Sequence, residues 1–301
     1  MARDYNIEPT ATVNINDIPL AVERVTNTVL QALAGEEPTA PAVRLLLRRY
    51  AATGRDDVHD ALEPALTRAL DIWPLTGRDK HAGWLMLFAE AAGVSDDARV
   101  HDAMAGLASS VQASWGRGRL IAAAAIGVDA CLRAAGADER VGNLQAAIDE
   151  LERLVADAYR PGEGVTTAAP GGRPRLADHI STASALLTAF EHTGRLPYSM
   201  LAEELMQFAA RTLADAGAPG FFDGETGSKP FALNCEAASV LCRLATLHGS
   251  DEYRGAAVLA AGADYGRDAG RILRWLAPEA PQLGLAGAVY GLAAADCHSA
   301  L

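Results

Sequence analysis

Apolar residues recur along this chain at spacings of three and four positions, the period of an α-helix that buries one face. The pattern predicts twelve helices with polar or glycine-containing connections between them. Twelve consecutive helices with mostly short connections predict six helical hairpins. We expect the helices at 17–34, 40–53, 56–73, 79–92, 96–114, 119–135, 138–158, 176–193, 197–215, 232–248, 251–275 and 282–297.

Five of the predicted helix ends share one local pattern. An apolar helix ends in small residues and a glycine, and an acidic or polar residue then begins the next segment. Glycine readily takes the left-handed conformation that ends a helix, while Asp, Glu and Ser stabilise the first turn of the helix that follows. The pattern therefore indicates tight turns within hairpins. The glycines concerned are Gly54, Gly93, Gly136, Gly194 and Gly249.

The predicted helices alternate in character along the chain. The even-numbered helices, such as 119–135 and 232–248, carry small and apolar residues on several faces, which is typical of helices enclosed by others. The odd-numbered helices, such as 138–158, have one apolar stripe and one charged face. This alternation favours an all-α (α/α)6 toroid, with six inner helices inside six outer ones. An open α-solenoid is the alternative, and glycine spacings between 39 and 58 residues are too uneven for a regular stack.

Composition and charge limit the class of protein. We expect one toroid domain over 17–301, preceded by an extended N-terminal arm over 1–16. The net charge of -12 argues against a binder of nucleic acid or anionic membranes, which needs clustered Lys and Arg. No uninterrupted apolar run reaches the roughly 18 residues of a membrane span. Asp4 and Glu8 lie where a signal peptide would be apolar. We therefore expect a cytoplasmic protein of undetermined oligomeric state.

The cysteines and the short motifs indicate no cofactor. The cysteines have no CxxC spacing, so the pattern favours reduced thiols over disulfides or a zinc site. The chain also contains no P-loop, dinucleotide fingerprint, HExxH or GxSxG motif. We expect neither a cofactor nor a metal. The cysteines are Cys131, Cys235, Cys242 and Cys297.

Connection lengths predict where a site would lie. The connections that lead into the inner helices include the long segments 159–175 and 216–232. In a closed toroid these connections meet at one mouth, around the N-termini of the inner helices. Free backbone N–H groups and the helix dipole favour an anionic or polar group there. We therefore expect a small-molecule ligand at this mouth.

Part of the chain resembles a known family. The segments LADHISTASALLTAFEHTGR and GFFDGETGSKPFALNCEAASVLCRLATLHGSDEYRGAA are similar to the C-terminal helical region of the thioredoxin-domain-containing family that includes spermatogenesis-associated protein twenty. The resemblance extends from Leu176 to Pro281. It implies an (α/α)6 toroid with a central pocket, related to the six-hairpin glycosidases, sugar epimerases and glucuronyl hydrolases. The CxxC pair of a thioredoxin domain is missing from this sequence.

Three residues near the expected mouth are candidates for catalysis. Asp178 and His179 begin the helix 176–193, and Glu236 lies near the start of the helix 232–248. Two carboxylates that face each other across a toroid would suit glycoside hydrolysis. Each carboxylate could instead only stabilise its helix dipole. Cys235 could act as a nucleophile, but a buried inert thiol is the favoured interpretation.

Further residues are candidates for holding a ligand. Aromatic side chains would provide stacking surfaces, and the polar side chains would bind hydroxyl or carboxylate groups. The alternative for the aromatic residues is core packing, and for the charged residues it is solvated surface. The candidates are His81, Trp84, Arg119, Phe222, Asp223, Asn234 and Gln282.

Three functions remain open from the sequence. The first is an enzyme that acts on a sugar-like or polar small molecule by acid/base chemistry. The second is a non-catalytic toroid that binds a ligand or a protein partner. The third is an enzyme for a hydrophobic, isoprenoid-like substrate, which the absence of an acidic metal-binding cluster disfavours.

Overall fold

The computed structural model describes residues 17–297 except 117, 119, 142, 167–173, 225–226, 258–259 and 261. The expected N-terminal arm over 1–16 lies outside the described residues. Nearly every element is a helix, and the helices form two layers. The inner helices are α2 (Ala40–Thr53), α4 (His81–Ala92), α6 (Ile121–Ala137), α8 (Leu176–Thr193), α10 (Phe231–Gly249) and α13 (Ala288–Cys297). The outer helices are α1 (Asp17–Leu33), α3 (Asp56–Ile72), α5 (Ala98–Gln112), α7 (Leu144–Ala158), α9 (Leu196–Thr212) and α12 (Tyr265–Leu276).

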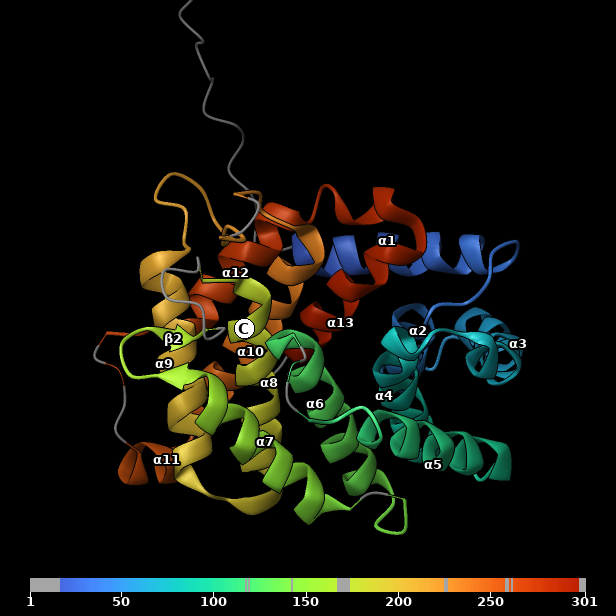
Figure 1. The fold of residues 1–301 in the computed structure, drawn as a ribbon. Helices are drawn as coiled ribbons and strands as arrows, with labels where there is room; N and C mark the ends of the chain where they lie inside the picture. The colour runs from blue at the N-terminus through green and yellow to red at the C-terminus, as the bar shows by residue number, and fades with distance from the viewer. Residues whose placement is uncertain are drawn as a thin grey trace, which may run out of the picture.

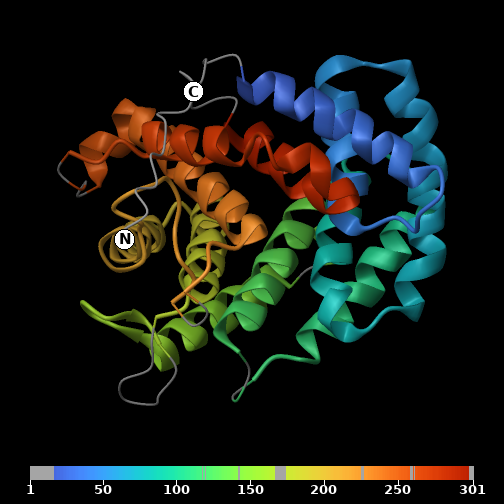
Figure 2. The ribbon, with the colours of Figure 1, turned by 90° about the horizontal axis from the view of Figure 1, so that it is seen from above.

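The inner helices form a closed ring. Each one packs against the next in chain order, and α13 packs against both α10 and α2. The first and last helices of the chain, α1 and α13, lie side by side (Figures 1 and 2). Closure distinguishes a toroid from a solenoid, whose end repeats do not meet. The predicted (α/α)6 toroid is therefore confirmed, and so is the assignment of even-numbered helices to the inner ring.

The turn chemistry explains several helix boundaries. Gly54 and Gly194 end α2 and α8 with φ of 63° and 65°, the left-handed conformation that was expected. The expectation is wrong for Gly136, which lies inside α6, and for Gly249, which is the last residue of α10, while Gly93 ends α4 with a right-handed φ of -72°. A Cβ atom at Gly136 would lie 2.4 Å from the ring of the exposed His192, so the His192 side chain packs directly on this glycine.

Two predicted helices are interrupted. The segment 251–275 contains α11 (Asp251–Ala256) and α12, because Asp264 caps a new helix by accepting a 3.0 Å hydrogen bond from the Arg267 N–H. The segment 282–297 contains the end of the 3-10 helix η3 (Ala280–Gly287) and then α13. Gly284, with φ of 56°, breaks its helical geometry.

Short elements complete the connections. The 3-10 helices η1 (Trp73–Leu75) and η2 (Arg78–Lys80) precede α4. The strands β1 (Tyr159–Arg160) and β2 (Gly164–Val165) pair antiparallel in the connection between α7 and α8. These connections lie at the end of the toroid where the inner helices begin.

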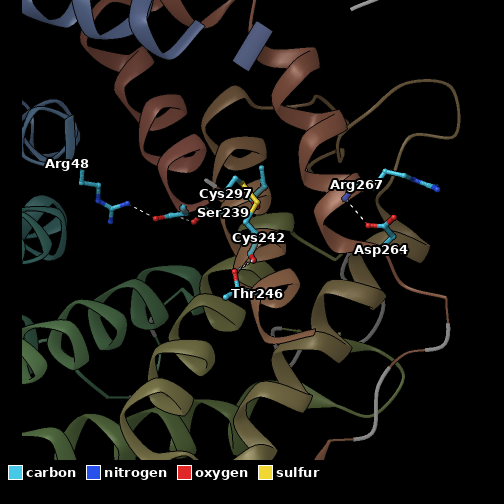
Figure 3. The surroundings of a disulfide bond; sticks show 9 residues. Arg48, Ser239, Cys242, Thr246, Asp264, Arg267 and Cys297 are labelled. Carbon is cyan, nitrogen blue, oxygen red and sulfur yellow. Dashed lines mark hydrogen bonds and ion pairs between the residues drawn. A yellow bond between two sulfur atoms is a disulfide. The ribbon is translucent and has the colours of Figure 1, made fainter. Parts of the chain in front are cut away.

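The structure corrects the prediction of four reduced cysteines. Cys242 of α10 and Cys297 of α13 form a disulfide, with their Cα atoms 5.0 Å apart (Figure 3). Cys131 and Cys235 are free and buried. Sequence spacing could not show this pairing, because the two half-cystines are 55 residues apart and meet only when the ring closes.

Candidate functional site

The centre of the toroid contains a cavity of about 260 Å³, and all six inner helices contribute to its lining. Apolar side chains alternate there with charged ones. Among the described residues of the lining, no side chain is aromatic. Such a cavity suits a small polar ligand better than a flat apolar one. The charged residues of the lining are Arg44, Arg48, Asp129, Arg133, Glu236 and Asp296.

Glu236, one of the predicted catalytic residues, points into this cavity. It lies in the second turn of α10, and its side chain is exposed to the cavity while protein surrounds it. Burial raises the pKa of Glu236 to about 7, with Arg44 lowering it and Asp129 raising it. It forms no hydrogen bond or ion pair with another described residue. A carboxyl group with these properties exchanges a proton near neutral pH.

Asp129 of α6 supplies a second carboxylate to the same cavity. Its oxygens accept hydrogen bonds from the hydroxyls of Thr188 at 2.6 Å and Ser184 at 2.8 Å, and from Arg133 Nε at 3.0 Å. Burial acts to raise the pKa of Asp129, but Arg133, Arg243 and the two hydroxyls outweigh it and hold that pKa below its usual value. Asp129 and Glu236 therefore have pKa shifts in opposite directions, which separates an ionised group from one that can carry a proton.

A belt of charged side chains links three inner helices at the cavity, and a serine hydroxyl adds a fourth. Glu90 Oε1 of α4 accepts hydrogen bonds from Arg44 at 2.6 Å and Arg48 at 2.7 Å, both of α2. Burial opposes ionisation of Glu90, but the two arginines lower its pKa to about 2. Arg48 also donates to Asp296 Oδ1 of α13 at 2.5 Å, and the Ser239 hydroxyl of α10 donates to the other oxygen (Figure 3). This belt crosses the seam where the ring closes.

Asp178 is buried beside the cavity and does not line it. It lies in the first turn of α8, where its Oδ1 accepts a 2.9 Å hydrogen bond from the Ala122 N–H at the start of α6. Burial raises the pKa of Asp178, opposed by this hydrogen bond and by Arg175 and reinforced by Asp223. The carboxylate therefore satisfies a free N–H group of a neighbouring helix. Glu236 is the member of the expected Asp178–Glu236 pair that faces the cavity.

His179 is also enclosed. Its ring stacks on Phe208 with centroids 4.9 Å apart, and its Nδ1 lies 2.8 Å from the Arg175 carbonyl oxygen. A Cβ atom at Gly164 of β2 would lie 2.3 Å from His179 Nε2, so the hairpin packs directly on the imidazole. Burial lowers the pKa of His179, which favours the neutral ring. These contacts place His179 under the hairpin and outside the lining of the central cavity.

The loop before α10 is held by Asn234. The Phe221 N–H donates to Asn234 Oδ1 at 2.7 Å, and Asn234 Nδ2 donates to the carbonyl oxygens of Phe221 at 3.1 Å and Pro230 at 3.0 Å. Asn234 is fully buried, so its amide serves the loop backbone. Lys229 Nζ lies 5.0 Å from the centre of the Phe222 ring. The candidates Phe222, Asp223 and Asn234 do not line the central cavity.

Asp223, in the same loop, is buried. Its N–H donates to the Ser228 carbonyl oxygen at 2.7 Å, while its carbonyl oxygen accepts a 2.7 Å hydrogen bond from the Gly227 N–H. The Oδ1 atom has no hydrogen-bond partner among the described residues. The charge of Asp223 raises the pKa of Asp178 at the start of α8, so the two carboxyl groups interact.

The remaining candidates lie on other surfaces. His81 is directed to the outer layer, where Nδ1 lies 2.8 Å from Ser110 Oγ of α5. Trp84 is buried and stacks with Phe88 in the core. Gln282 is exposed in η3, and its side chain donates to the Pro278 carbonyl oxygen at 3.0 Å. Arg119 lies outside the described residues.

Sequence reasoning missed most of the charged lining. The available signal was a charged residue within an otherwise apolar inner helix, such as Asp129 in IAAAAIGVDACL or Asp296 in GLAAADC. Charges are rare in enclosed helices unless they are paired. The partners of these residues come from other helices, so the pairing could not be recognised from one segment.

No group of three or more His, Cys, Asp or Glu side chains has an arrangement that could hold a metal ion within the described part of the chain. In the same part, no helix combines the length and the apolar character required to cross a membrane.

Comparisons with solved structures show one fold class for the chain, the (α/α)6 toroid. It is similar to an unsaturated glucuronyl hydrolase specific for heparin, with a TM-score of 0.72 and 11% identity over 95% of this chain and 98% of that chain. It is also similar to the unsaturated glucuronyl hydrolase of Bacillus sp. GL1, with a TM-score of 0.67 and 10% identity over 88% and 85% of the two chains.

A structure with a different glycosidase activity shows the same similarity. The GH76A α-1,6-mannanase of Salegentibacter sp. HEL1_6 matches with a TM-score of 0.68 and 11% identity over 94% of this chain and 99% of that chain. No family model and no curated protein sequence matches the chain. At such low identity the similarity establishes the fold, and the reaction has to be argued from the site.

Proposed function

We propose that this protein is an enzyme that acts by acid/base chemistry on a small sugar-like or polar substrate in the central cavity. The observation that carries the proposal is Glu236, a carboxyl group without an ion pair among the described residues, facing a cavity lined by all six inner helices. Its pKa of about 7 suits proton donation at neutral pH. The similar solved structures are glycoside hydrolases, which supports a sugar-like substrate.

Glu236 and Asp129 would have different roles. Glu236 would donate its proton to the leaving-group oxygen as the glycosidic C–O bond breaks, and a solvent water would then add to the sugar carbon and return a proton to Glu236. Asp129, held ionised by Arg133 and two hydroxyls, would stabilise positive charge that develops on the substrate. Asp178 and His179 would act as positioning residues, because they hold the N-terminal part of α8, and Ser181 one turn further on lines the cavity.

We also propose that the segment from Leu176 to Pro281 is related to the thioredoxin-domain-containing family that it resembles. The support is that the shared Gly-Phe-Phe-Asp and Lys-Pro-x-x-x-Asn positions form one structural unit. Asn234 binds the backbone of Phe221, and Lys229 contacts the same loop. Because Asn234 and Lys229 hold the loop in place, the loop's structure gives a physical reason for the two segments to share these residues.

A second candidate function is a non-catalytic toroid that binds a small polar ligand. The specific observation in its favour is the lack of aromatic side chains in the described lining of the central cavity, since sugar sites commonly use aromatic stacking. If the protein is an enzyme, Glu236→Gln should lower turnover. If it is a non-catalytic toroid, there is no turnover and the substitution can change only ligand binding.

The test is a hydrolysis screen with chromogenic glycosides and unsaturated uronides, followed by Glu236→Gln. The proposal predicts turnover by the wild-type protein and a loss of at least 100-fold in kcat for the variant, the lower range of general acid catalysis. Glu252→Gln is the matched control, because Glu252 is exposed on α11. Binding of a screened sugar without turnover would favour the non-catalytic toroid, and equal turnover by both variants would refute the role of Glu236.

A further inference from the structure

A second cavity of about 500 Å³ lies outside the inner ring, between the outer helices α9 and α12. It exceeds the central cavity of about 260 Å³. Both outer helices pack against α10, and Leu241 of α10 contributes to the lining. No residue of the short helix α11 lines it. We call this cavity the α9–α12 groove. Its buried apolar residues are Met206, Phe221, Leu241 and Ile272.

One wall of the groove is the loop that the sequence motif builds. Gly220 and Phe221 line the groove, and the amide of Asn234 holds them from behind. Gly220 has φ of 96°, and a Cβ atom there would lie 2.7 Å from Asn234 Oδ1, so only glycine fits. Lys229 Nζ binds Asp215 at 2.5 Å and the Pro219 carbonyl oxygen at 3.1 Å. The motif residues therefore form a rigid wall of this groove.

The opposite wall is also fixed before any ligand binds. Tyr265, at the start of α12, is buried and donates a 2.8 Å hydrogen bond to Glu203 of α9. Gln207 Nε2 of α9 donates to the Tyr265 hydroxyl at 3.1 Å. These bonds join the two helices at one end of the groove. A cavity with fixed walls loses little entropy when a ligand enters.

The charges of the groove indicate what it binds. Arg211 of α9 and Arg271 of α12 both line it, both are exposed, and neither forms a hydrogen bond or ion pair with another described residue. Asp215 is neutralised by Lys229. Asp268, one turn before Arg271, adds one exposed negative charge, so the groove favours one anionic group and disfavours several.

We propose that the α9–α12 groove binds a small amphipathic molecule with a single anionic group. Arg211 and Arg271 bind the carboxylate, sulfonate or phosphate monoester, and the apolar body of the molecule lies against Leu241 and its neighbours. Guanidinium groups suit such anions because they donate paired hydrogen bonds. The site is separate from the central cavity, so it does not depend on the proposed catalysis.

The test is titration calorimetry of the full chain with octanoate, octanol and octylamine. Octanoate is expected to bind at least tenfold more tightly than octanol, and octylamine is expected not to bind. Arg211→Ala and Arg271→Ala should each weaken octanoate binding at least fivefold. Arg24→Ala, an exposed arginine on α1, is the control and should leave binding unchanged. Equal binding of the three compounds, or no binding of any, would overturn the proposal.

A third variant locates the binding site. Ala210 is an exposed residue that lines the groove, and Ala210→Trp should fill part of it and weaken octanoate binding at least fivefold without disturbing the core. Glu236→Gln should leave octanoate binding unchanged, because it alters only the central cavity. If Ala210→Trp binds octanoate normally, or if Glu236→Gln loses it, the ligand lies elsewhere and the proposal is wrong.

Discussion

Replacing Glu236 by Gln should make the protein more stable at alkaline pH. Burial raises the pKa of this carboxyl group from 4.5 to about 7, so the folded protein keeps a proton that the unfolded chain loses. The contribution of protonated Glu236 to the free energy of unfolding is complete below about pH 4.5 and is lost as the pH rises through 7. Such a shift corresponds to about 3 kcal/mol. Exposure to the cavity allows screening, so we expect about 1–2 kcal/mol.

The assay is urea unfolding of the wild-type protein and Glu236→Gln at pH 5 and pH 8. The difference between the two proteins at each pH isolates Glu236, because all other titrating groups are shared. From pH 5 to pH 8, the free energy of unfolding of the variant should rise by about 1–2 kcal/mol relative to that of the wild type. Glu252→Gln should show no such gain, since its side chain is exposed on α11. A wild-type-to-variant difference that is the same at both pH values would refute the reasoning.

Three further predictions concern stability. Asn234→Ala should lower the free energy of unfolding by about 2–4 kcal/mol in urea titrations, because it removes the three hydrogen bonds that the fully buried Asn234 amide makes to the loop backbone; a loss below 0.5 kcal/mol would contradict this. Asp129→Ala should cost about 3 kcal/mol by leaving Arg133 without its carboxylate partner, and Asp129→Ala with Arg133→Met should recover part of the loss, which a double-mutant cycle measures. Reduction of the Cys242–Cys297 disulfide should cost about 2–4 kcal/mol, and the unfolded, unreduced protein should contain two reactive thiols; four would exclude the disulfide.

The helices could be predicted because their information is local. Apolar spacing identifies a helix whatever it later packs against, and glycines such as Gly54 and Gly194 end helices by their own backbone conformation. The single long helix expected over 251–275 failed because a cap at Asp264 competes with helix continuation. Local rules of similar strength oppose each other there, and only the surrounding packing decides between them.

The candidate site was only partly predictable. Glu236 could be proposed because it lies near the start of an inner helix, where a side chain can reach the centre. Asp178 begins an inner helix in the same way, but its carboxylate binds the N–H of Ala122 on a neighbouring helix. Position along a helix does not reveal which neighbour a side chain meets.

By itself, the sequence determined most of the helices and their alternation between enclosed and half-exposed faces, which favoured a closed double ring over an open solenoid. Only the tertiary structure decided which charged residues share the central cavity, that Cys242 pairs with Cys297, and that the motif loop forms a wall of the α9–α12 groove. The physical reason is one of range. Helical period and capping act within a few residues, whereas a pKa, a disulfide or a cavity depends on side chains that ring closure brings together from distant segments.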